Sequence, residues 1–251
     1  MALYIIGLGL GNEKDITVKG LELIKQSNVV YLESYTSLLQ CSHLNLEKMY
    51  GKKVQKAMRM DVEEDKNKIL EQAKTKKVSL LVIGDPMSAT THVDLLLRAK
   101  KENIHVEVVH NASILTAIGI IGLQLYKFGK ITSIPFPQDN FQPETPYDVL
   151  KINKKNAMHT LFLLDLKPEE NKFMTVKQAL EYLLFLESKR KQKVLNQNTL
   201  AIGCARIGSD NVNKTGKIKD LLQFDFGKAP HCVIIPAKMH FMEEEALEMW
   251  K

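Results

Sequence analysis

The chain has 251 residues, of which 45% are hydrophobic and 25% are charged. This balance predicts a folded protein with a sizeable core, in one large or two medium domains. The formal net charge of +6 is compatible with nucleic acid, but the lysines are spread along the chain, as is typical of a solvated surface, so no nucleic-acid partner is expected. The longest apolar stretches fall short of the ~20 residues that cross a bilayer, and the N-terminus lacks the basic lead-in of a signal peptide. We therefore expect no membrane association and a cytoplasmic location.

Short apolar runs alternate with amphipathic segments through the first half of the chain. Strands are predicted at 3–7, 29–33, 78–84 and 106–110, and helices at 20–27, 62–76 and 92–102. This order is typical of parallel strands whose two faces are covered by helices. It predicts an α/β lobe over residues 1–112.

A second lobe is predicted over residues 113–251, after a connection within 111–147. The stretch 111–130 is apolar, contains glycine and resembles a helix, whereas 131–149 holds four of the eight prolines and should lack regular structure. Strands are then predicted at 159–166, 199–208 and 231–237, with helices at 175–193 and 240–250. Two α/β lobes predict ligand binding near the ends of strands.

A glycine-rich turn, "IIGLGLGNEKD" (5–15), follows the first predicted strand and invites a dinucleotide-binding interpretation. Its spacing is G-x-G-x-G, and Asn12 stands where the third glycine of that motif belongs. The next helix also begins near Thr17, too late for its N-terminus to meet a pyrophosphate at the turn. We therefore interpret these glycines as tight backbone turns rather than as an NAD or FAD site.

Cysteine and histidine positions argue against a disulfide or a metal site. Cys41, Cys204 and Cys232 are widely spaced and odd in number, which is typical of reduced thiols. His231 and Cys232 are neighbours, but successive side chains of a strand point to opposite faces. We expect free thiols and no bound metal.

The segment "GDPMSATTH" (84–92) runs directly out of a predicted strand. An unpaired carboxylate is costly at the end of a buried strand, so Asp85 should be bonded to backbone amides, to a ligand or to both. The residues after Pro86 are small or carry hydroxyl groups, which leaves room for a ligand, and Thr91 is placed to cap a helix that starts at His92. On the residues alone, the segment fits a plain strand-to-helix turn as well as a binding loop.

Six segments, in order along nearly the whole chain, resemble one family: "YIIGLGLGNEKDITVKGLELI", "VVYLESYTSLL", "GDPMSATTH", "VVHNASILTAIGIIGLQLYKFGKITSIPF", "ARIGSDN" and "APHCVIIPAKMHFMEEEAL". They are similar to the diphthine synthases, the methyltransferases of diphthamide biosynthesis, which are a branch of the tetrapyrrole methylase superfamily. The resemblance implies an S-adenosylmethionine-dependent enzyme with two α/β lobes of the tetrapyrrole methylase type and the cofactor in the cleft between them.

The resemblance also implies which residues bind the cofactor. They are Leu10, Asp85, Ser88, Ser113, Ile114, Leu164, Ile207 and His231. Taken singly, Ile114 and Leu164 are equally suited to a core, and His231 to bonding a backbone carbonyl. Residues 209–217 are slightly compacted relative to the family, which bears on contacts just after Arg206. The sequence identifies no catalytic residue.

The family acts on elongation factor 2, on a histidine that carries a 3-amino-3-carboxypropyl group, and methylates its amino nitrogen repeatedly. Archaeal members stop at the trimethylated amine, whereas eukaryotic members also esterify the carboxylate. The lysine- and asparagine-rich stretch 187–198 suggests a eukaryotic source, and hence four transfers and a methyl ester. The resemblance further implies a homodimer. The alternatives are an RNA methyltransferase of the same superfamily, which the basic charge would suit, and a cofactor-gated binding module without turnover.

Overall fold

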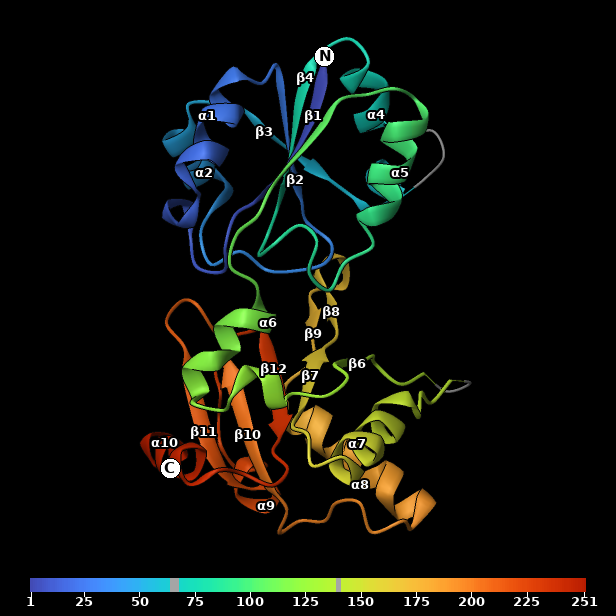
Figure 1. Cartoon of the computed structure of the whole chain (residues 1–251), viewed down its shortest axis with the longest axis vertical. Helices are drawn as coiled ribbons and strands as arrows, with labels where there is room; N and C mark the ends of the chain where they lie inside the picture. Colours follow the sequence, from blue (N-terminus) through green and yellow to red (C-terminus); the bar gives the residue numbers. More distant parts are fainter. Residues whose placement is uncertain (64–67, 139–140) are drawn as a thin grey trace. The chain divides into compact units, whose positions relative to one another are not determined.

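The computed structural model describes residues 1–63, 68–138 and 141–251. Its contacts divide the chain into two compact units, each of which contains helices and a sheet (Figure 1). Unit 1 comprises Met1–Ala117 and Pro168–Glu170, and unit 2 comprises Ile118–Lys167 and Asn171–Lys251. The predicted α/β class is confirmed, and the boundary predicted after residue 112 lies inside unit 1.

Unit 1 is built on a sheet of five strands in which all neighbours are parallel. Its order is β3-β2-β4-β1-β5, with β1 at Ala2–Gly7, β2 at Val29–Glu33, β3 at Val54–Ala57, β4 at Lys77–Val82 and β5 at Val106–Val109. Parallel neighbours need crossover connections, which here carry helices. These are α1 (Val18–Gln26), α2 (His43–Tyr50), α3 (Arg59–Glu63), α4 (Lys68–Ala73) and α5 (Val93–Lys101).

Both faces of the unit 1 sheet are buried. Ile5 of β1 belongs to one core cluster together with Leu95 of α5, and Ile6 belongs to another together with Ile24 of α1. Figure 1 accordingly shows α1 and α2 on one side of the sheet and α4 and α5 on the other. All six residues of β1 are buried, which explains the unbroken apolar run of this central parallel strand.

Unit 2 contains a mixed sheet with the order β11-β10-β12-β7-β6, in which only the pair of β6 and β7 is parallel. Its strands are β6 (Thr132–Ile134), β7 (Thr160–Leu164), β10 (Leu200–Ala205), β11 (Val212–Lys217) and β12 (His231–Ile235). A short ribbon of β8 (Leu166–Lys167) and β9 (Lys172–Phe173) follows β7. The helices are α7 (Thr145–Lys155), α8 (Val176–Arg190), α9 (Ile218–Leu221) and α10 (Phe241–Leu247).

The core of unit 2 joins α7, α8 and α9 to one face of this sheet. Residues of the opposite face, such as Ile202 and Ile234, are also buried, and Figure 1 shows α10 on that side. The longest helix, α8, begins after Thr175, which forms a capping box with Gln178. Within the described residues, no helix is both long and apolar enough to cross a membrane.

Two predictions for the middle of the chain were wrong in detail. The stretch 111–130 is not one helix but a short helix, α6 (Ile114–Ala117), and two 3₁₀ turns at Ile118–Ile121 and Leu125–Lys127. Gly122 interrupts it with a φ of 95°, a conformation that favours glycine. The proline-rich stretch 131–149 contains β6 and the start of α7, because Pro146 lies in the first turn of that helix, where its missing N–H is not needed.

Other elements were shifted or not predicted. The helix predicted at 62–76 includes residues 64–67, which lie outside the described residues, and the remainder forms the end of α3 and all of α4. The elements absent from the prediction include one helix, α2, and two strands, β3 and β11. The two strands lie at the edges of their sheets and carry polar residues, so they lack the apolar pattern that marks a buried strand.

Candidate functional site

Three neighbouring strands of unit 1 end at one edge of its sheet. The strand order β4-β1-β5 places the loops after these strands side by side, since parallel strands share the edge at which they end. Gly9, after β1, pairs with Gly84, after β4, through two backbone hydrogen bonds, from Gly84 N to Gly9 O (2.8 Å) and from Gly9 N to Gly84 O (3.2 Å). The glycine-rich turn and the "GDPMSATTH" segment are therefore parts of one site.

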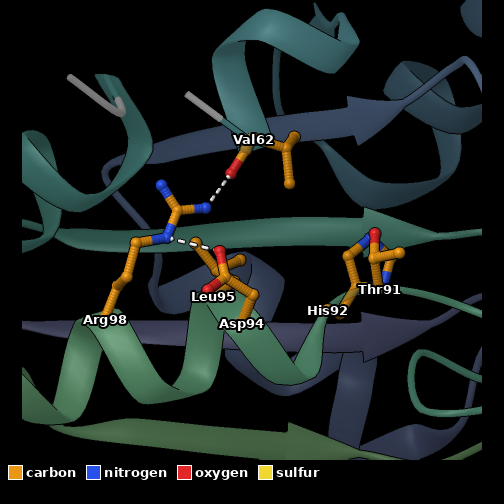
Figure 2. Close-up of a pocket in the computed structure, with 6 residues that line it drawn as sticks. All are labelled: Val62, Thr91, His92, Asp94, Leu95 and Arg98. Atoms are coloured by element: carbon orange, nitrogen blue, oxygen red, sulfur yellow. Dashed lines mark hydrogen bonds and ion pairs between the residues drawn. The ribbon is translucent and has the colours of Figure 1, made fainter. Parts of the chain in front are cut away.

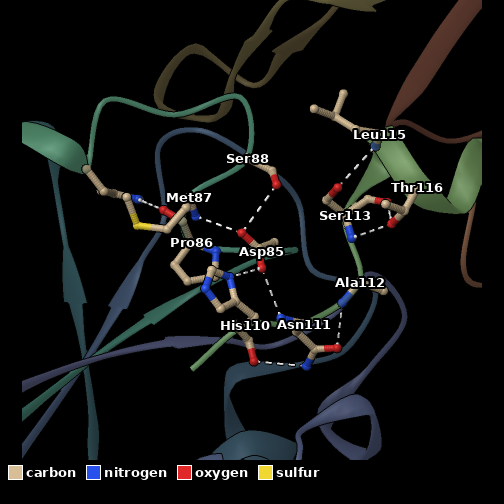
Figure 3. A network of polar contacts seen from close by, with 12 residues as sticks. Asp85, Pro86, Met87, Ser88, His110, Asn111, Ala112, Ser113, Leu115 and Thr116 are labelled. Carbon is tan, nitrogen blue, oxygen red and sulfur yellow. Dashed lines mark hydrogen bonds and ion pairs between the residues drawn. The ribbon is translucent and has the colours of Figure 1, made fainter. Parts of the chain in front are cut away.

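The Asp85 carboxylate is the centre of this site (Figure 3). Its Oδ1 accepts hydrogen bonds from Met87 N (2.8 Å) and Ser88 Oγ (3.2 Å). Its Oδ2 accepts from Asn111 N (3.1 Å) and lies 2.8 Å from His110 Nδ1. Burial raises the pKa of this carboxyl, but the bonds from Met87, Asn111 and His110 outweigh it and hold the pKa below its ordinary value. Asp85 is thus a buried, charged group with four protein partners, as its strand-end position predicts.

The other predicted residues of unit 1 lie around Asp85. Leu10 lies over Gly84, since its Cδ2 is 3.7 Å from where a Cβ on Gly84 would stand, and Ala112 O is 3.8 Å from the same point. Ser113 follows at once and is buried, and its Oγ accepts from Leu115 N (3.2 Å). Ile114 is the first residue of α6 and is half-buried. The structure therefore brings Leu10, Asp85, Ser88, Ser113 and Ile114 to one edge of the unit 1 sheet.

The remaining three predicted residues lie at one end of the unit 2 sheet. The antiparallel register pairs Ala205, the last residue of β10, with His231, the first of β12. It also pairs Cys232 with Leu163, which places Leu164 beside His231 at the same end. Ile207 follows β10 by two residues, and the neighbouring Arg206 N donates to Pro230 O (2.8 Å). Leu164, Ile207 and His231 are therefore neighbours within unit 2.

His231 differs from the two apolar residues in its unused hydrogen-bonding capacity. Leu164 belongs to the hydrophobic core of unit 2, as its sequence alone would suggest. The His231 side chain is buried, and its Nε2 donates to Lys228 O (3.0 Å). Burial lowers the pKa of this imidazole, which is therefore neutral near pH 7. Its Nδ1 is an acceptor without a protein partner, which is the kind of buried polar atom that a bound ligand satisfies.

A pocket of about 180 Å³ lies at the C-terminal end of the "GDPMSATTH" segment (Figure 2). It is lined by Val62, Thr91, His92, Asp94, Leu95 and Arg98. His92 holds the N-cap position of α5, not Thr91 as predicted. The buried His92 Nδ1 donates to Pro86 O (3.0 Å) and so braces the turn from this side. Arg98 is paired with Asp94 (2.8 Å) and donates to Val62 O (2.6 Å), so the pocket's charged groups bond to one another.

Neither a dinucleotide site nor a metal site is supported by this geometry. Helix α1 begins at Val18 with Thr17 as its N-cap, beyond the glycine turn as expected. Within that turn Gly11 N donates to Asp15 Oδ2 (2.7 Å), which uses one of its amides. Across residues 1–63, 68–138 and 141–251, no group of three or more histidine, cysteine or acidic side chains is placed to hold a metal ion. The three cysteines are free thiols.

The arrangement matches one known family. The model of the Tetrapyrrole (Corrin/Porphyrin) Methylases matches residues 2–221. The chain belongs to the tetrapyrrole methylase family. Among relatives, it is 48% identical to a diphthine synthase of Methanocaldococcus jannaschii, over 98% of this chain and 97% of the relative. It is also 48% identical to a diphthine methyl ester synthase of Dictyostelium discoideum, over 100% and 98% of the two chains.

Solved structures give the same result. A structure from Entamoeba histolytica described as a diphthine synthase superposes with a TM-score of 0.93 at 48% identity, covering 100% of this chain and 98% of that one. A second diphthine synthase structure gives a TM-score of 0.91 at 39% identity, covering 100% and 96%. The predicted resemblance and the tetrapyrrole methylase fold are confirmed.

Two residues of the candidate site were not predicted from the sequence. His110 and Asn111 both bond to Asp85 and directly follow β5. The available signal was their position, because polar residues just after a parallel strand lie at the edge where the neighbouring strands also end. The strand-end position predicted partners for Asp85, whereas the apolar pattern of residues 111–130 predicted a helix there.

Proposed function

We propose that this tetrapyrrole methylase transfers methyl groups from S-adenosylmethionine to elongation factor 2 in diphthamide biosynthesis. The acceptor is the amino nitrogen of a histidine that carries a 3-amino-3-carboxypropyl group. The observation that carries the proposal is the similarity to diphthine synthases at 48% identity over practically the whole chain. This substrate would also place the enzyme in the cytoplasm, where translation factors act.

The residues present fit the cofactor. S-adenosylmethionine, when bound, supplies a methyl group on a sulfonium sulfur, which is a good leaving group. The chain supplies small and polar groups suited to adenosine and an amino-acid tail, namely Ser88, Ser113 and the neutral His231, and apolar surface from Leu10 and Ile207. His231 Nδ1 is a buried acceptor without a protein partner, and a ligand N–H or O–H could satisfy it. The predicted contact residues thus remain our proposal for the cofactor site.

Asp85 would serve the cofactor through the turn that it shapes. Its carboxylate accepts from four protein groups, so its oxygens are already engaged. By accepting from Met87 N and Ser88 Oγ it fixes the backbone of the "GDPMSATTH" turn. The Pro86 carbonyl of the same turn accepts from His92 Nδ1. A turn fixed in advance favours catalysis by alignment, because in-line methyl transfer depends on holding donor and acceptor at reacting distance. The acceptor amine must be neutral to react, and no residue is assigned as its base.

The proposal predicts four transfers and a methyl ester product. Relatives at the same 48% identity carry the names diphthine synthase and diphthine methyl ester synthase, so identity alone does not choose between them. After three methyl groups the amine has no lone pair, and a fourth can go only to the carboxylate. Purified protein is incubated with labelled S-adenosylmethionine and elongation factor 2 that carries the aminocarboxypropyl intermediate, and the product is weighed by intact mass spectrometry. We expect four added methyl groups, one of which mild alkali removes.

Each possible result of this experiment has a defined meaning. No label on the factor would reject the proposed function, and three alkali-stable methyl groups would reject the ester. A parallel reaction with ribosomal RNA tests the RNA methyltransferase, which the comparisons do not favour. Cofactor binding without transfer to any translation component would instead indicate a binding module.

We further propose that the enzyme is a homodimer. The part of unit 2 that follows α6 exposes apolar side chains, with Ile120 at 55% and Tyr126 at 78% exposure, while Ile118 and Ile121 are buried. Phe241 and Met242 of α10 are also exposed, and exposed apolar surface of this kind is typical of association sites. Light scattering at micromolar concentration should give twice the monomer mass of 28.5 kDa. A single 28.5 kDa species would contradict the dimer.

A further inference from the structure

Asn111 uses every polar atom of its side chain to connect segments of the candidate site (Figure 3). Its Nδ2 donates to Gly7 O (2.9 Å) and to Asp15 O (3.0 Å), the two ends of the turn that follows β1. Its Oδ1 accepts from Ala112 N (2.8 Å). Its backbone N–H donates to Asp85 Oδ2 (3.1 Å). One residue therefore bonds to the glycine turn, to the Asp85 turn and to the segment that leads into Ser113.

The glycines of the first turn are matched to this asparagine. A Cβ on Gly7 would stand 2.8 Å from Asn111 Cβ, and a Cβ on Gly9 would stand 3.3 Å from Asn111 Oδ1. The first distance is shorter than carbon atoms tolerate, so the turn lies against Asn111 only because position 7 has no side chain. Gly7 and Asn111 are far apart in sequence but form one packed contact.

The chemistry of the side chain explains why an amide is required here. Two backbone carbonyls need donors and one backbone N–H needs an acceptor, and among short side chains only asparagine offers two N–H donors together with an acceptor oxygen. Aspartate has nearly the same shape but no donor, so its charge would face the carbonyls of Gly7 and Asp15. Serine is too short to replace both donors.

We propose that Asn111 is a positioning residue for the methyl-donor site. It fixes Leu10, Asp85 and the Ser113–Ile114 segment relative to one another before the donor binds. The inference rests on the proposed function, because it assumes that the segments carrying these residues contact S-adenosylmethionine. Loss of the Asn111 side chain should therefore weaken donor binding more than it affects the use of the protein substrate.

A second asparagine provides a matched control. Asn153 in unit 2 has the same pattern of bonds, with Nδ2 donating to Lys130 O (2.8 Å) and Thr160 Oγ1 (3.1 Å) and Oδ1 accepting from Lys130 N (3.0 Å). It is buried and lies outside the candidate site. Replacing either asparagine with aspartate removes the same donors and adds the same charge, so a purely structural effect should be common to both variants.

The experiment measures S-adenosylmethionine binding by calorimetry for the full-length wild type, Asn111→Asp and Asn153→Asp, together with thermal melting and steady-state kinetics. We expect the dissociation constant and the KM for the donor to rise at least about tenfold in Asn111→Asp, from loss of two donors and the added repulsion. The KM for the protein substrate and kcat should change less. Asn153→Asp should lower the melting temperature while binding the donor within about twofold of wild type, because residues at distant sites without shared partners are nearly independent.

The outcomes separate the inference from the function on which it rests. If the wild type fails to bind the donor, the proposed function fails. If the wild type binds and Asn111→Asp binds equally well, or if Asn153→Asp weakens binding to the same degree, the positioning role is overturned. Should Asn111→Asp not fold, Asn111→Ser replaces it, with the same expected direction and the same overturning result.

Discussion

Replacing Asp85 with alanine should weaken S-adenosylmethionine binding by about tenfold to a hundredfold while unit 1 stays folded. A hydrogen bond to a charged group contributes about 1.5–3 kcal/mol, and each 1.4 kcal/mol corresponds to a factor of ten in affinity. Asp85 has four such partners, two of which, Met87 N and Ser88 Oγ, lie in the turn that carries the proposed contacts. Calorimetry measures the affinity, and circular dichroism reports whether the fold is retained.

Asp94→Ala is the matched control for this prediction. Asp94 lies nine residues further along, on α5, and its side chain is 64% exposed in an ion pair with Arg98. Because an exposed ion pair contributes little, the control should bind the donor as the wild type does. Unchanged affinity of Asp85→Ala would remove Asp85 from the site, and equal losses in both variants would indicate a general effect of the missing carboxylate.

The lowered pKa of Asp85 predicts how its contribution to stability depends on pH. Its pKa is lowered in the folded protein, so its stabilising contribution is complete above its ordinary pKa and is lost only as the pH falls through the lower, folded value. Between about pH 5 and 8 the carboxylate therefore stays charged, and its contribution to the turn should be constant.

Replacing Glu243 with alanine should destabilise unit 2 by about 3–5 kcal/mol, the cost of removing one partner of a buried ion pair. Glu243 has no exposed surface. It is paired with Lys127, accepts from Gln124 N (2.9 Å) and His240 N (2.7 Å), and lies 3.0 Å from His159 Nε2. Alanine would remove the carboxylate that all four of these groups share.

Trp250 provides the measurement. It is the one tryptophan of the chain, lies in unit 2 and donates from its indole N–H to Ile121 O (3.1 Å), so its fluorescence in a urea titration follows this unit. Glu248→Ala is the control, since Glu248 forms an exposed pair with Lys251 and should change the free energy of unfolding by less than about 0.5 kcal/mol. A similarly small change in Glu243→Ala would show that the buried cluster does not stabilise unit 2.

The same cluster should make unit 2 sensitive to acid. Burial raises the pKa of Glu243, but the bonds from Lys127, His240 and Gln124 outweigh it and lower the pKa to about 2. Its contribution is therefore complete above its ordinary pKa and is lost as the pH falls toward about 2. Burial lowers the pKa of His159 in the folded state. As the pH falls, the unfolded state is therefore protonated at this residue before the folded state, and the free energy of unfolding again decreases. Both titrations act in the same direction.

A helix or strand could be predicted from the sequence where its own residues carry the pattern typical of that element. The central strands of unit 1 were predicted because both of their faces are buried, which leaves a continuous apolar run, as in β1. Strands β3 and β11 were missed because an edge strand is held by its one neighbour and can be polar. Helix α7 was not predicted because Pro146 counts against a helix interior, although proline is tolerated in the first turn, where this residue lies.

In the candidate site, too, the features set by local sequence were predicted and those set by the order of strands were not. Asp85 was found because a carboxylate at the end of a buried strand requires partners, and that requirement is local. Which groups are its partners depends on the order of the strands in the sheet, which brings Asn111 and Gly7 together across 104 positions of sequence. Local patterns do not contain that order, so the network around Asp85 could be read only from the structure.

The position of β12 and α10 in unit 2 has a consequence for how the two units form during synthesis. All five strands of the unit 1 sheet lie before residue 110, so this sheet can assemble while the rest of the chain is still being made. The unit 2 sheet has β12 between β10 and β7, and Gly122 faces Ala246 of α10 so closely that no Cβ would fit between them. Residues 118–164 therefore have no complete core until translation has passed Leu247. Because domains generally fold as units from the N-terminus, the unit 1 sheet should form first, and β7 of unit 2 should lack its neighbour β12 until that late strand has been made.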